Sequence, residues 1–372
     1  MNIDPLLKAL ADALHGEGPA VELSVDEGGQ PVALTIQTPG FDDAAVVVRT
    51  SGSTGTPKAT VLTVECLAAS SMATAIALRG EGQWLLALPV QYVAGLQVLI
   101  RSLFAGTRPW AMDLSAGFTP EAFTAAAQEL TDRTRFTSLV PTQLQRLLDS
   151  PSAETLAVLR RFNAILLGGA PIPPELLQAA RDAGLNVVKT YGSAETSGGC
   201  VYDGVALEGV EVRIDDDGRI LLGGDTIAAG YLEGPDDGTF FEEDGIRWFR
   251  SSDLGELTED GTLSVLGRAD DVIITGGVKV SAAHVQAELE KLDGVTAAFV
   301  AGVPSERWGQ AVAAYVAVDG VAAEAIHAQA RTAMGALAPK TIHADVELLM
   351  LPNGKPDRIA MTGKLESLHQ GE

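Results

Sequence analysis

The feature that most constrains the fold is an alternation of short apolar strands and amphipathic helices in the middle of the chain. Three strands are expected at 138–140, 164–167 and 187–190, and the helices between them at 142–148 and 175–183. This alternation predicts a mostly parallel sheet with helices on its faces. In such sheets ligands bind beyond the carboxyl ends of the strands. The loops that follow these strands are therefore the first places to search for a site.

The regions before and after this alternation predict other patterns of secondary structure. Residues 1–41 predict a short helix and a hairpin around Gly28, followed by a helix at 64–78 and a buried strand at 84–88. After Gly204 short alternating strands with acidic turns predict an antiparallel barrel or sheet. The last 103 residues predict a small α+β domain, with helices at 282–292 and 322–334 and strands at 297–303 and 311–318.

Composition excludes several function classes. The chain has 372 residues and a net charge of −23, so nucleic acid and anionic membrane surfaces would repel it. The uncharged run 82–100 contains Pro and Gln, which predicts strand, loop and helix and no membrane insertion. The N-terminus lacks a signal-peptide pattern, and Cys66 and Cys200 are expected to be reduced and buried. These features favour a cytoplasmic protein.

A loop rich in glycine and hydroxyl groups follows the apolar segment 44–48. Its glycines allow consecutive amides to turn toward one anion, and its hydroxyls and lysine add donors and charge. Two residues separate the last glycine from the lysine, so the loop is not a GxxxxGK[ST] P-loop. The alternative is a solvated linker. We predict a polyphosphate cradle formed by Thr50, Ser51, Gly52, Ser53, Thr54, Gly55 and Lys58.

This loop resembles the nucleotide-phosphate signature of the adenylate-forming (acyl- and aryl-CoA synthetase) superfamily, and so does the segment 191–196. The resemblance implies that Tyr191 stacks on adenine and that Glu195 holds Mg²⁺. Ala194 stands where the family has a threonine that touches the α-phosphate, so Ser193 or Thr196 would have to replace that hydroxyl. Other positions assigned to the nucleotide and acyl site are Gly168, Gly169, Ala170 and Gly192. Taken alone, 168–171 is equally well read as a tight turn.

Three later segments resemble the same superfamily. Ser251–Gly255 is similar to its TGDxG motif, which implies that Asp253 accepts the ribose hydroxyls. The segment 267–277 implies that Arg268 also reaches the ribose, that Asp270 is a hinge, and that Gly276 and Gly277 line the pantetheine tunnel. We therefore expect an N-terminal domain at 1–269 and a mobile C-terminal domain at 270–372. The segment 352–358 resembles the loop that carries the catalytic lysine, here Lys355.

Two further segments, 88–96 and 138–148, resemble the 2-succinylbenzoate:CoA ligases of menaquinone biosynthesis. Tyr92 stands where that family has a gating histidine, and Gly95 follows it. Arg101 stands where the family has an arginine facing the succinyl carboxylate; the alternative is a surface helix residue. The chain before the phosphate loop is short for the superfamily, which suggests a homodimer in which a partner subunit supplies a pocket wall.

The resemblance implies an ATP-dependent, AMP-forming acid:CoA ligase that uses ATP, Mg²⁺ and coenzyme A. The acid is expected to be 2-succinylbenzoate. Another aryl- or acyl-CoA ligase, or an enzyme that loads a carrier protein, is the alternative. Hydrolase, dinucleotide and zinc-site motifs are missing from the sequence, and its five histidines are scattered.

Overall fold

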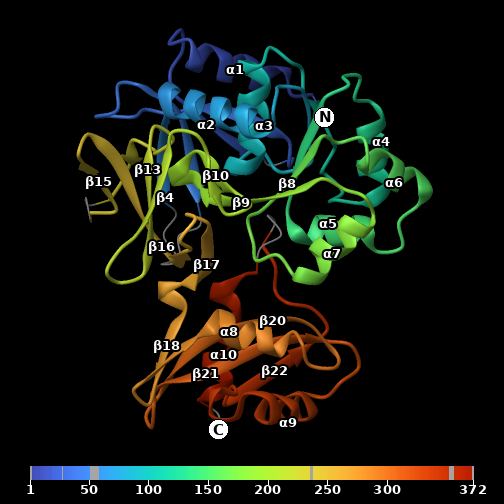
Figure 1. The fold of residues 1–372 in the computed structure, drawn as a ribbon, viewed down its shortest axis with the longest axis vertical. Helices are drawn as coiled ribbons and strands as arrows, with labels where there is room; N and C mark the ends of the chain where they lie inside the picture. Colours follow the sequence, from blue (N-terminus) through green and yellow to red (C-terminus); the bar gives the residue numbers. More distant parts are fainter. Residues whose placement is uncertain (1, 27, 51–57, 235–237, 352–355, 371–372) are drawn as a thin grey trace. The chain divides into compact units, whose positions relative to one another are not determined.

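The computed structural model describes the chain except for residues 1, 27, 51–57, 235–237, 352–355 and 371–372. The chain divides into two compact units (Figure 1). The first comprises Met1–Arg213, Leu221–Arg250 and Leu257–Leu263, and the second comprises Ile214–Ile220, Ser251–Glu256 and Ser264–Glu372. The expected boundary at Asp270 stays a prediction.

A five-stranded sheet carries the phosphate loop between two neighbouring strands. Its order is β14 (Gly230–Tyr231), β4 (Lys58–Thr63), β3 (Ala44–Thr50), β1 (Val21–Val25), β2 (Pro31–Thr35). β1 and β2 form the antiparallel hairpin expected around Gly28, after helix α1 (Asp4–Leu14). The loop 51–57 therefore connects adjacent antiparallel strands.

The central sheet confirms the predicted parallel arrangement. Its order is β11 (Val205–Ala206), β10 (Gly198–Tyr202), β9 (Val187–Ser193), β8 (Ala164–Leu167), β7 (Arg135–Leu139), β5 (Gln83–Leu86), β6 (Trp110–Ala111). Strands β6, β5, β7, β8 and β9 are parallel to their neighbours. Strand β10 pairs antiparallel with β9, and β11 pairs antiparallel with β10. Strands buried on both faces need apolar residues at every position, which explains why β8 reads as a continuous apolar run.

Helices cover both faces of the central sheet, and the side chains of each strand alternate between them. One face packs Leu85 and Ile165 against Phe123 and Leu144. The helices on that face are α4 (Pro120–Gln128), α5 (Pro141–Leu148), α6 (Ala153–Leu159) and α7 (Pro174–Asp182). On the other face lie α2 (Val64–Ala77) and α3 (Val93–Phe104), and α2 also contacts β4 of the first sheet. Helix α2 therefore lies between the phosphate-loop sheet and the central sheet.

The acidic-turn region forms a third sheet. Its order is β12 (Val210–Ile214), β13 (Arg219–Gly224), β16 (Ile246–Leu257), β15 (Phe240–Glu243), with β17 (Leu263–Arg268) paired to β16. Residues 254–257 lie in the region where short strands were expected, and they form the end of the twelve-residue strand β16. Strands β12, β13 and β16 contribute residues to both compact units.

The remaining residues of the second unit form an α+β fold, as predicted. Its sheet has the order β19 (Val278–Ser281), β18 (Val272–Thr275), β21 (Gly309–Val318), β20 (Val295–Ser305), with β22 (Thr341–Asp345) parallel to β21. Val285 of α8 (Ala282–Leu289) and Ile326 of α9 (Ala323–Met334) pack in one core. Met361 of α10 (Arg358–His369) packs in a second core.

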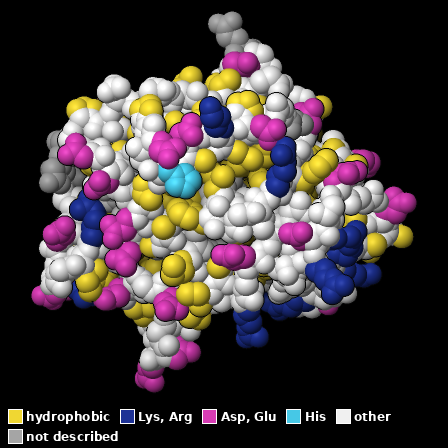
Figure 2. Space-filling model, turned by 90° about the horizontal axis from the view of Figure 1, so that it is seen from above, with side chains coloured by type: hydrophobic (Ala, Val, Ile, Leu, Met, Phe, Trp, Pro, Cys, Tyr) yellow, Lys and Arg dark blue, Asp and Glu magenta, His cyan; other side chains and the backbone are white. Residues whose placement is uncertain are grey.

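The surface reflects the acidic composition. Figure 2 shows Asp and Glu side chains spread widely over one face, with Lys and Arg in a few groups and apolar side chains between them.

Cys66 and Cys200 are buried and unpaired, and burial raises the pKa of the Cys200 thiol to about 12. No helix among the described residues is long and apolar enough to cross a membrane.

Candidate active site

The carboxyl ends of β7, β8 and β9 bring two predicted site loops together. In the register of the sheet Leu139 lies beside Leu167, which lies beside Lys189, so the next residues of each strand share one edge. Gly168 packs against Thr190: a Cβ built on Gly168 would lie 2.4 Å from Thr190 Oγ1 and 2.7 Å from its carbonyl oxygen. Only glycine fits this contact, and Gly168 therefore presents main chain to the edge.

A tight connection between β9 and β10 places the segment 191–196 at the same edge. Gly192 has φ +156°, and a Cβ there would lie 2.1 Å from the carbonyl oxygen of Gly198. Ser197, between the strands, adopts a left-handed conformation with φ +53°. Tyr191 is half-buried. The close approach of the strands fixes the backbone on which Tyr191 and Glu195 are carried.

Two hydroxyls could replace the threonine that the sequence lacks at Ala194. The hydroxyl of Thr196 is buried; it accepts from the Ser193 amide at 2.9 Å and donates to the Gly198 carbonyl at 2.7 Å. By contrast, Ser193 Oγ has no hydrogen-bond partner among the described residues. Thr196 thus stabilises the turn, and Ser193 keeps the hydrogen-bonding capacity that an α-phosphate contact requires.

Glu195, the predicted metal ligand, is held by a residue that the sequence did not single out. The hydroxyl of Tyr231 donates to Glu195 Oε1 at 2.8 Å, and Glu195 is only 9% exposed. Lys58 Nζ lies 4.5 Å from the centre of the Tyr231 ring. Tyr231 is in the two-residue strand β14, opposite Thr60 of β4. A single tyrosine therefore connects the carboxylate with the lysine of the phosphate loop.

The donor set fits Mg²⁺ bound together with a polyphosphate. Mg²⁺ commonly takes one or two protein carboxylates, phosphate oxygens and water. Among the described residues no group of three or more His, Cys, Asp or Glu side chains could form a metal cage. The buried carboxylate of Glu195, which the Tyr231 hydroxyl orients, fits a site in which protein and phosphate oxygens bind Mg²⁺ together.

The ends of the phosphate loop are close together. Thr50, the last residue of β3, pairs directly with Lys58, the first residue of β4. Ser51, Gly52, Ser53, Thr54 and Gly55 lie outside the described residues. Their predicted role in binding phosphate stays a prediction.

The two residues predicted to bind ribose lie together in the second unit. Arg268 Nη1 is 3.9 Å from Asp253 Oδ1. The amide of Asp253 donates to Ser251 Oγ at 3.1 Å, which fixes the turn that carries the carboxylate. An aspartate beside an arginine offers acceptors and donors to vicinal hydroxyls, as the predicted role requires.

The glycines predicted to line the pantetheine tunnel form the turn between β18 and β19. Gly276 has φ +57° and donates its amide to the Trp308 carbonyl at 2.9 Å. Gly277 has φ +82° and an open surrounding. Lys355 and the side chain of Asp270 lie outside the described residues. Their roles stay predictions.

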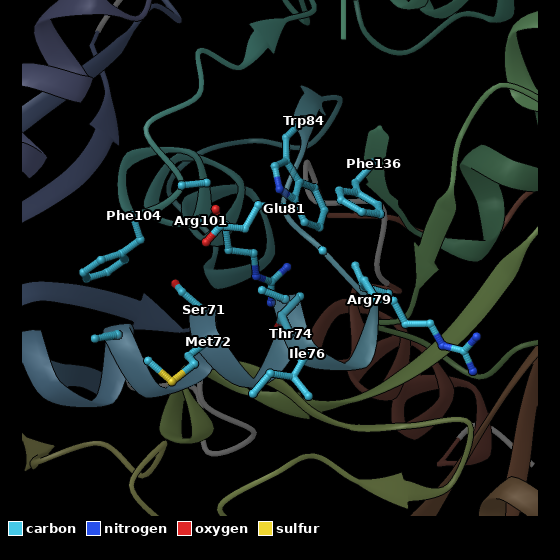
Figure 3. Close-up of a pocket in the computed structure, with 15 residues that line it drawn as sticks. Ser71, Met72, Thr74, Ile76, Arg79, Glu81, Trp84, Arg101, Phe104 and Phe136 are labelled. Atoms are coloured by element: carbon cyan, nitrogen blue, oxygen red, sulfur yellow. The ribbon is translucent and has the colours of Figure 1, made fainter. Parts of the chain in front are cut away.

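The residues predicted to meet the acid lie on α3. Tyr92 is the N-cap residue of α3, and burial raises the pKa of its hydroxyl above the usual value. A Cβ on Gly95 would lie 2.2 Å from the Pro89 carbonyl, so packing of the helix on the preceding loop explains this glycine. Arg101 is only 6% exposed and lines a pocket of about 430 Å³ (Figure 3). It is not the surface residue of the alternative interpretation, and its contact with the acid stays a prediction.

Comparisons with known proteins agree with this geometry. Residues 7–232 match the family described as AMP-binding enzyme. The chain belongs to the AMP-binding enzyme family. Residues 284–355 also match the C-terminal domain of AMP-binding enzymes.

Relatives of the family cover nearly the whole chain. A protein of Mycobacterium tuberculosis H37Rv named probable 2-succinylbenzoate–CoA ligase is 43% identical over 366 residues, which is 96% of this chain and 94% of the relative. The 2-succinylbenzoate–CoA ligase of Listeria monocytogenes is 31% identical over 76% of this chain, which spans 62% of that relative.

Solved structures show the same fold. The o-succinylbenzoate CoA synthetase of Bacillus subtilis in complex with its acyl-adenylate intermediate has a TM-score of 0.74 at 25% identity, covering 88% of this chain and 70% of that chain. The same synthetase with ATP and magnesium ion has a TM-score of 0.73 at 25% identity, covering 89% and 71%. The predicted superfamily and the predicted α/β fold are thus confirmed.

Proposed function

We propose that the chain is an ATP-dependent, AMP-forming acid:CoA ligase that converts 2-succinylbenzoate into 2-succinylbenzoyl-CoA in menaquinone biosynthesis. The arrangement of Lys58, Tyr231 and Glu195 carries the adenylating chemistry, because it places a cation and a metal-binding carboxylate around one edge. The relative of M. tuberculosis, similar over nearly its full length, supports the acid.

In the first half-reaction a carboxylate oxygen of the acid attacks the α-phosphorus of ATP, and pyrophosphate leaves. Glu195 would hold Mg²⁺, which neutralises phosphate charge when bound. Lys58 and the loop from Thr50 hold the phosphates, Tyr191 stacks on adenine, and Ser193 donates to the α-phosphate. The main chain at 168–170 and 192 forms the floor on which the acyl-adenylate lies. Lys355 stabilises the negative charge that develops at the α-phosphate.

In the second half-reaction the thiolate of coenzyme A attacks the acyl carbon, and AMP leaves with the bonding electrons. We propose that Asp253 and Arg268 keep hold of the ribose. A rotation at Asp270 withdraws Lys355 and presents Gly276 and Gly277 to the pantetheine arm. Two half-reactions with different catalytic surfaces require such a movement.

The test is pyrophosphate release measured with a panel of acids, followed by thioester formation with coenzyme A. We expect 2-succinylbenzoate to give the highest kcat/KM and the thioester to form with free coenzyme A. If long-chain acids react faster, the substrate assignment is wrong and the AMP-forming chemistry remains. If the acyl group passes only to a carrier protein, the enzyme is a carrier-loading one.

Two further proposals concern the assembly and the location. We propose a homodimer, supported by apolar side chains exposed on α2 and α3, such as Met72 (66% exposed) and Phe104 (43% exposed). Light scattering that gives the mass of one chain would contradict the homodimer.

We also propose a cytoplasmic location, supported by the two unpaired thiols.

A further inference from the structure

A short buried loop precedes Tyr231, the residue whose hydroxyl holds Glu195. The loop comprises residues 225–229 and connects β13 to β14 within the first unit. Ile227 is 4% exposed, and Ala228 is completely buried. Backbone amides and carbonyls that are buried outside helices and sheets need other hydrogen-bond partners, because leaving them unpaired costs free energy. The partners of this loop therefore determine where Tyr231 begins.

One side of the loop is bonded to the candidate active site. The amide of Ala228 donates to the backbone carbonyl of Glu195 at 2.9 Å. The amide of Ala229 donates to the carbonyl of Val61 in β4 at 3.0 Å. The loop thus connects the turn that carries the predicted metal ligand with the strand that follows the phosphate loop.

On the other side a single guanidinium binds two consecutive carbonyls of the loop. Arg247 lies on β16 and is half-buried. Its Nε donates to the Ala228 carbonyl at 2.8 Å, and its Nη2 donates to the Ala229 carbonyl. The planar guanidinium holds its donors in a rigid fork, so one side chain can fix two neighbouring acceptors. Hydrogen bonds from a charged donor are also stronger than those between neutral groups.

The same guanidinium lies against a ring that packs on Tyr231. The Arg247 guanidinium carbon is 5.4 Å from the centre of the Phe240 ring. The ring centres of Phe240 and Tyr231 are 5.1 Å apart, and the ring planes are inclined by 69°. Arg247 therefore supports Tyr231 in two ways, through the main chain that precedes it and through the ring beside it.

We propose that Arg247 is a positioning residue for the Mg²⁺-dependent binding of ATP. It fixes the loop 225–229 and the Phe240 ring, and these hold the Tyr231 hydroxyl 2.8 Å from Glu195 Oε1. The orientation of the carboxylate that would bind Mg²⁺ thus depends on an arginine on a different sheet. This inference rests on the proposed function, because it assigns a role in the first half-reaction.

The first test is titration calorimetry of ATP with and without Mg²⁺, with AMP as the ligand that needs no metal. We expect Mg²⁺ to tighten the binding of ATP to the parent enzyme. Arg247→Leu should reduce this tightening about threefold to tenfold, a part of the factor that loss of the tyrosine hydroxyl itself would cost. The Kd of AMP should change less than about twofold, since no metal carboxylate is needed for it.

Two other arginine variants are matched to this one. Arg247→Lys keeps the charge but loses the fork, so its effect on ATP binding should be intermediate. Arg213→Leu is the control in the same sheet, because the Arg213 guanidinium carbon also lies over a ring, 4.1 Å from the centre of Trp248, and forms an ion pair with Glu243. It should leave the effect of Mg²⁺ unchanged. Equal effects of Arg213→Leu and Arg247→Leu would overturn the proposal.

A double-mutant cycle with Tyr231→Phe tests the route from the arginine to the carboxylate. Pyrophosphate release is measured for both single variants and for the double variant over a Mg²⁺ series. If Arg247 acts through the tyrosine hydroxyl, Arg247→Leu should cost less than about twofold more in a chain that already carries Tyr231→Phe. Losses that multiply would show that the arginine acts independently of Tyr231, and the proposal would be wrong.

Thermal unfolding shows whether Arg247→Leu folds, because the carbonyls of residues 228 and 229 lose this donor. If it does not fold, Phe240→Leu provides the test through the ring. That variant should also reduce the tightening of ATP binding by Mg²⁺, and an unchanged effect of Mg²⁺ would overturn the proposal. Failure to release pyrophosphate with any acid of the panel would instead contradict the proposed function, and the ATP titrations would still decide the role of Arg247.

Discussion

Tyr231→Phe is the substitution that tests the candidate active site most directly. It removes the hydroxyl that donates to Glu195 Oε1 and keeps the ring beneath Lys58. We expect adenylation to need more Mg²⁺ and to lose kcat/KM for ATP. Thioester formation from supplied acyl-adenylate should be unchanged, because that step does not use the metal carboxylate.

The magnitude follows from the burial of the carboxylate. A hydrogen bond to a charged group contributes about 1.5–3 kcal/mol, and each 1.36 kcal/mol corresponds to a factor of about ten in rate. Water replaces a lost donor easily at an exposed carboxylate, but Glu195 is 91% buried, since 9% of its surface is exposed. A loss of about 10- to 100-fold in kcat/KM is therefore expected.

The assay is pyrophosphate release over a Mg²⁺ series at fixed ATP and acid. Tyr202→Phe is the matched control, because it removes a buried hydroxyl 3.0 Å from Thr74 in the same unit without touching Glu195. It should lower the Tm and leave the Mg²⁺ dependence unchanged. A Tyr231→Phe enzyme with parental kcat/KM and Mg²⁺ dependence would refute the role of the tyrosine.

Four other outcomes are expected. Lys355→Ala should lose adenylation by roughly 10²–10³ and still convert supplied acyl-adenylate to thioester; equal losses would contradict domain alternation. Asp270→Pro should retain one half-reaction and lose the other, because proline fixes φ and removes an amide donor; a folded variant that performs both at the parental rate would place the hinge elsewhere. Gly168→Ala should impair adenylation through the clash with β9, whereas Gly363→Ala in α10, with open space around it, should be neutral or stabilising in thermal unfolding. Cys200 should resist a thiol reagent at pH 8 in the folded enzyme and react in urea. Burial raises the pKa of the Cys200 thiol to about 12, so the thiol stays protonated in the folded enzyme. Its contribution to the free energy of unfolding is therefore fully present below the pKa of the unfolded chain, 9.0, and is lost as the pH rises toward about 12.

The sequence predicted the parallel core well, because apolar strands buried on both faces and amphipathic helices have distinct sequence patterns. The strand at 164–167 was predicted with its observed bounds, and α2 and α7 were predicted within one residue at each end. The family motifs also identified residues that the fold brings together, such as Asp253 and Arg268. Local sequence patterns and family motifs were sufficient to predict features that depend on residues close together in the sequence.

Tertiary contacts between distant segments could not be predicted in this way. Tyr231 lies 36 residues from Glu195 on a two-residue strand, and nothing in a Gly-Tyr dipeptide indicates its partner. The spacing of Arg101 on α3 gave its helix position but not its end of the sheet, which depends on how the helix packs on β5. Thr196 was one of two hydroxyls considered for phosphate, and only its contacts with Ser193 and Gly198 show that it stabilises the turn.

The glycine contacts at the carboxyl edge also determine how the enzyme could be redesigned. A side chain at Gly168 or Gly192 would collide with neighbouring backbone, and one at Gly199 would press on Thr190, before it could touch an acid. Substitutions at these positions would therefore displace the strands that carry the site before they could change the specificity for the acid. Selection for another acid should therefore leave these glycines unchanged.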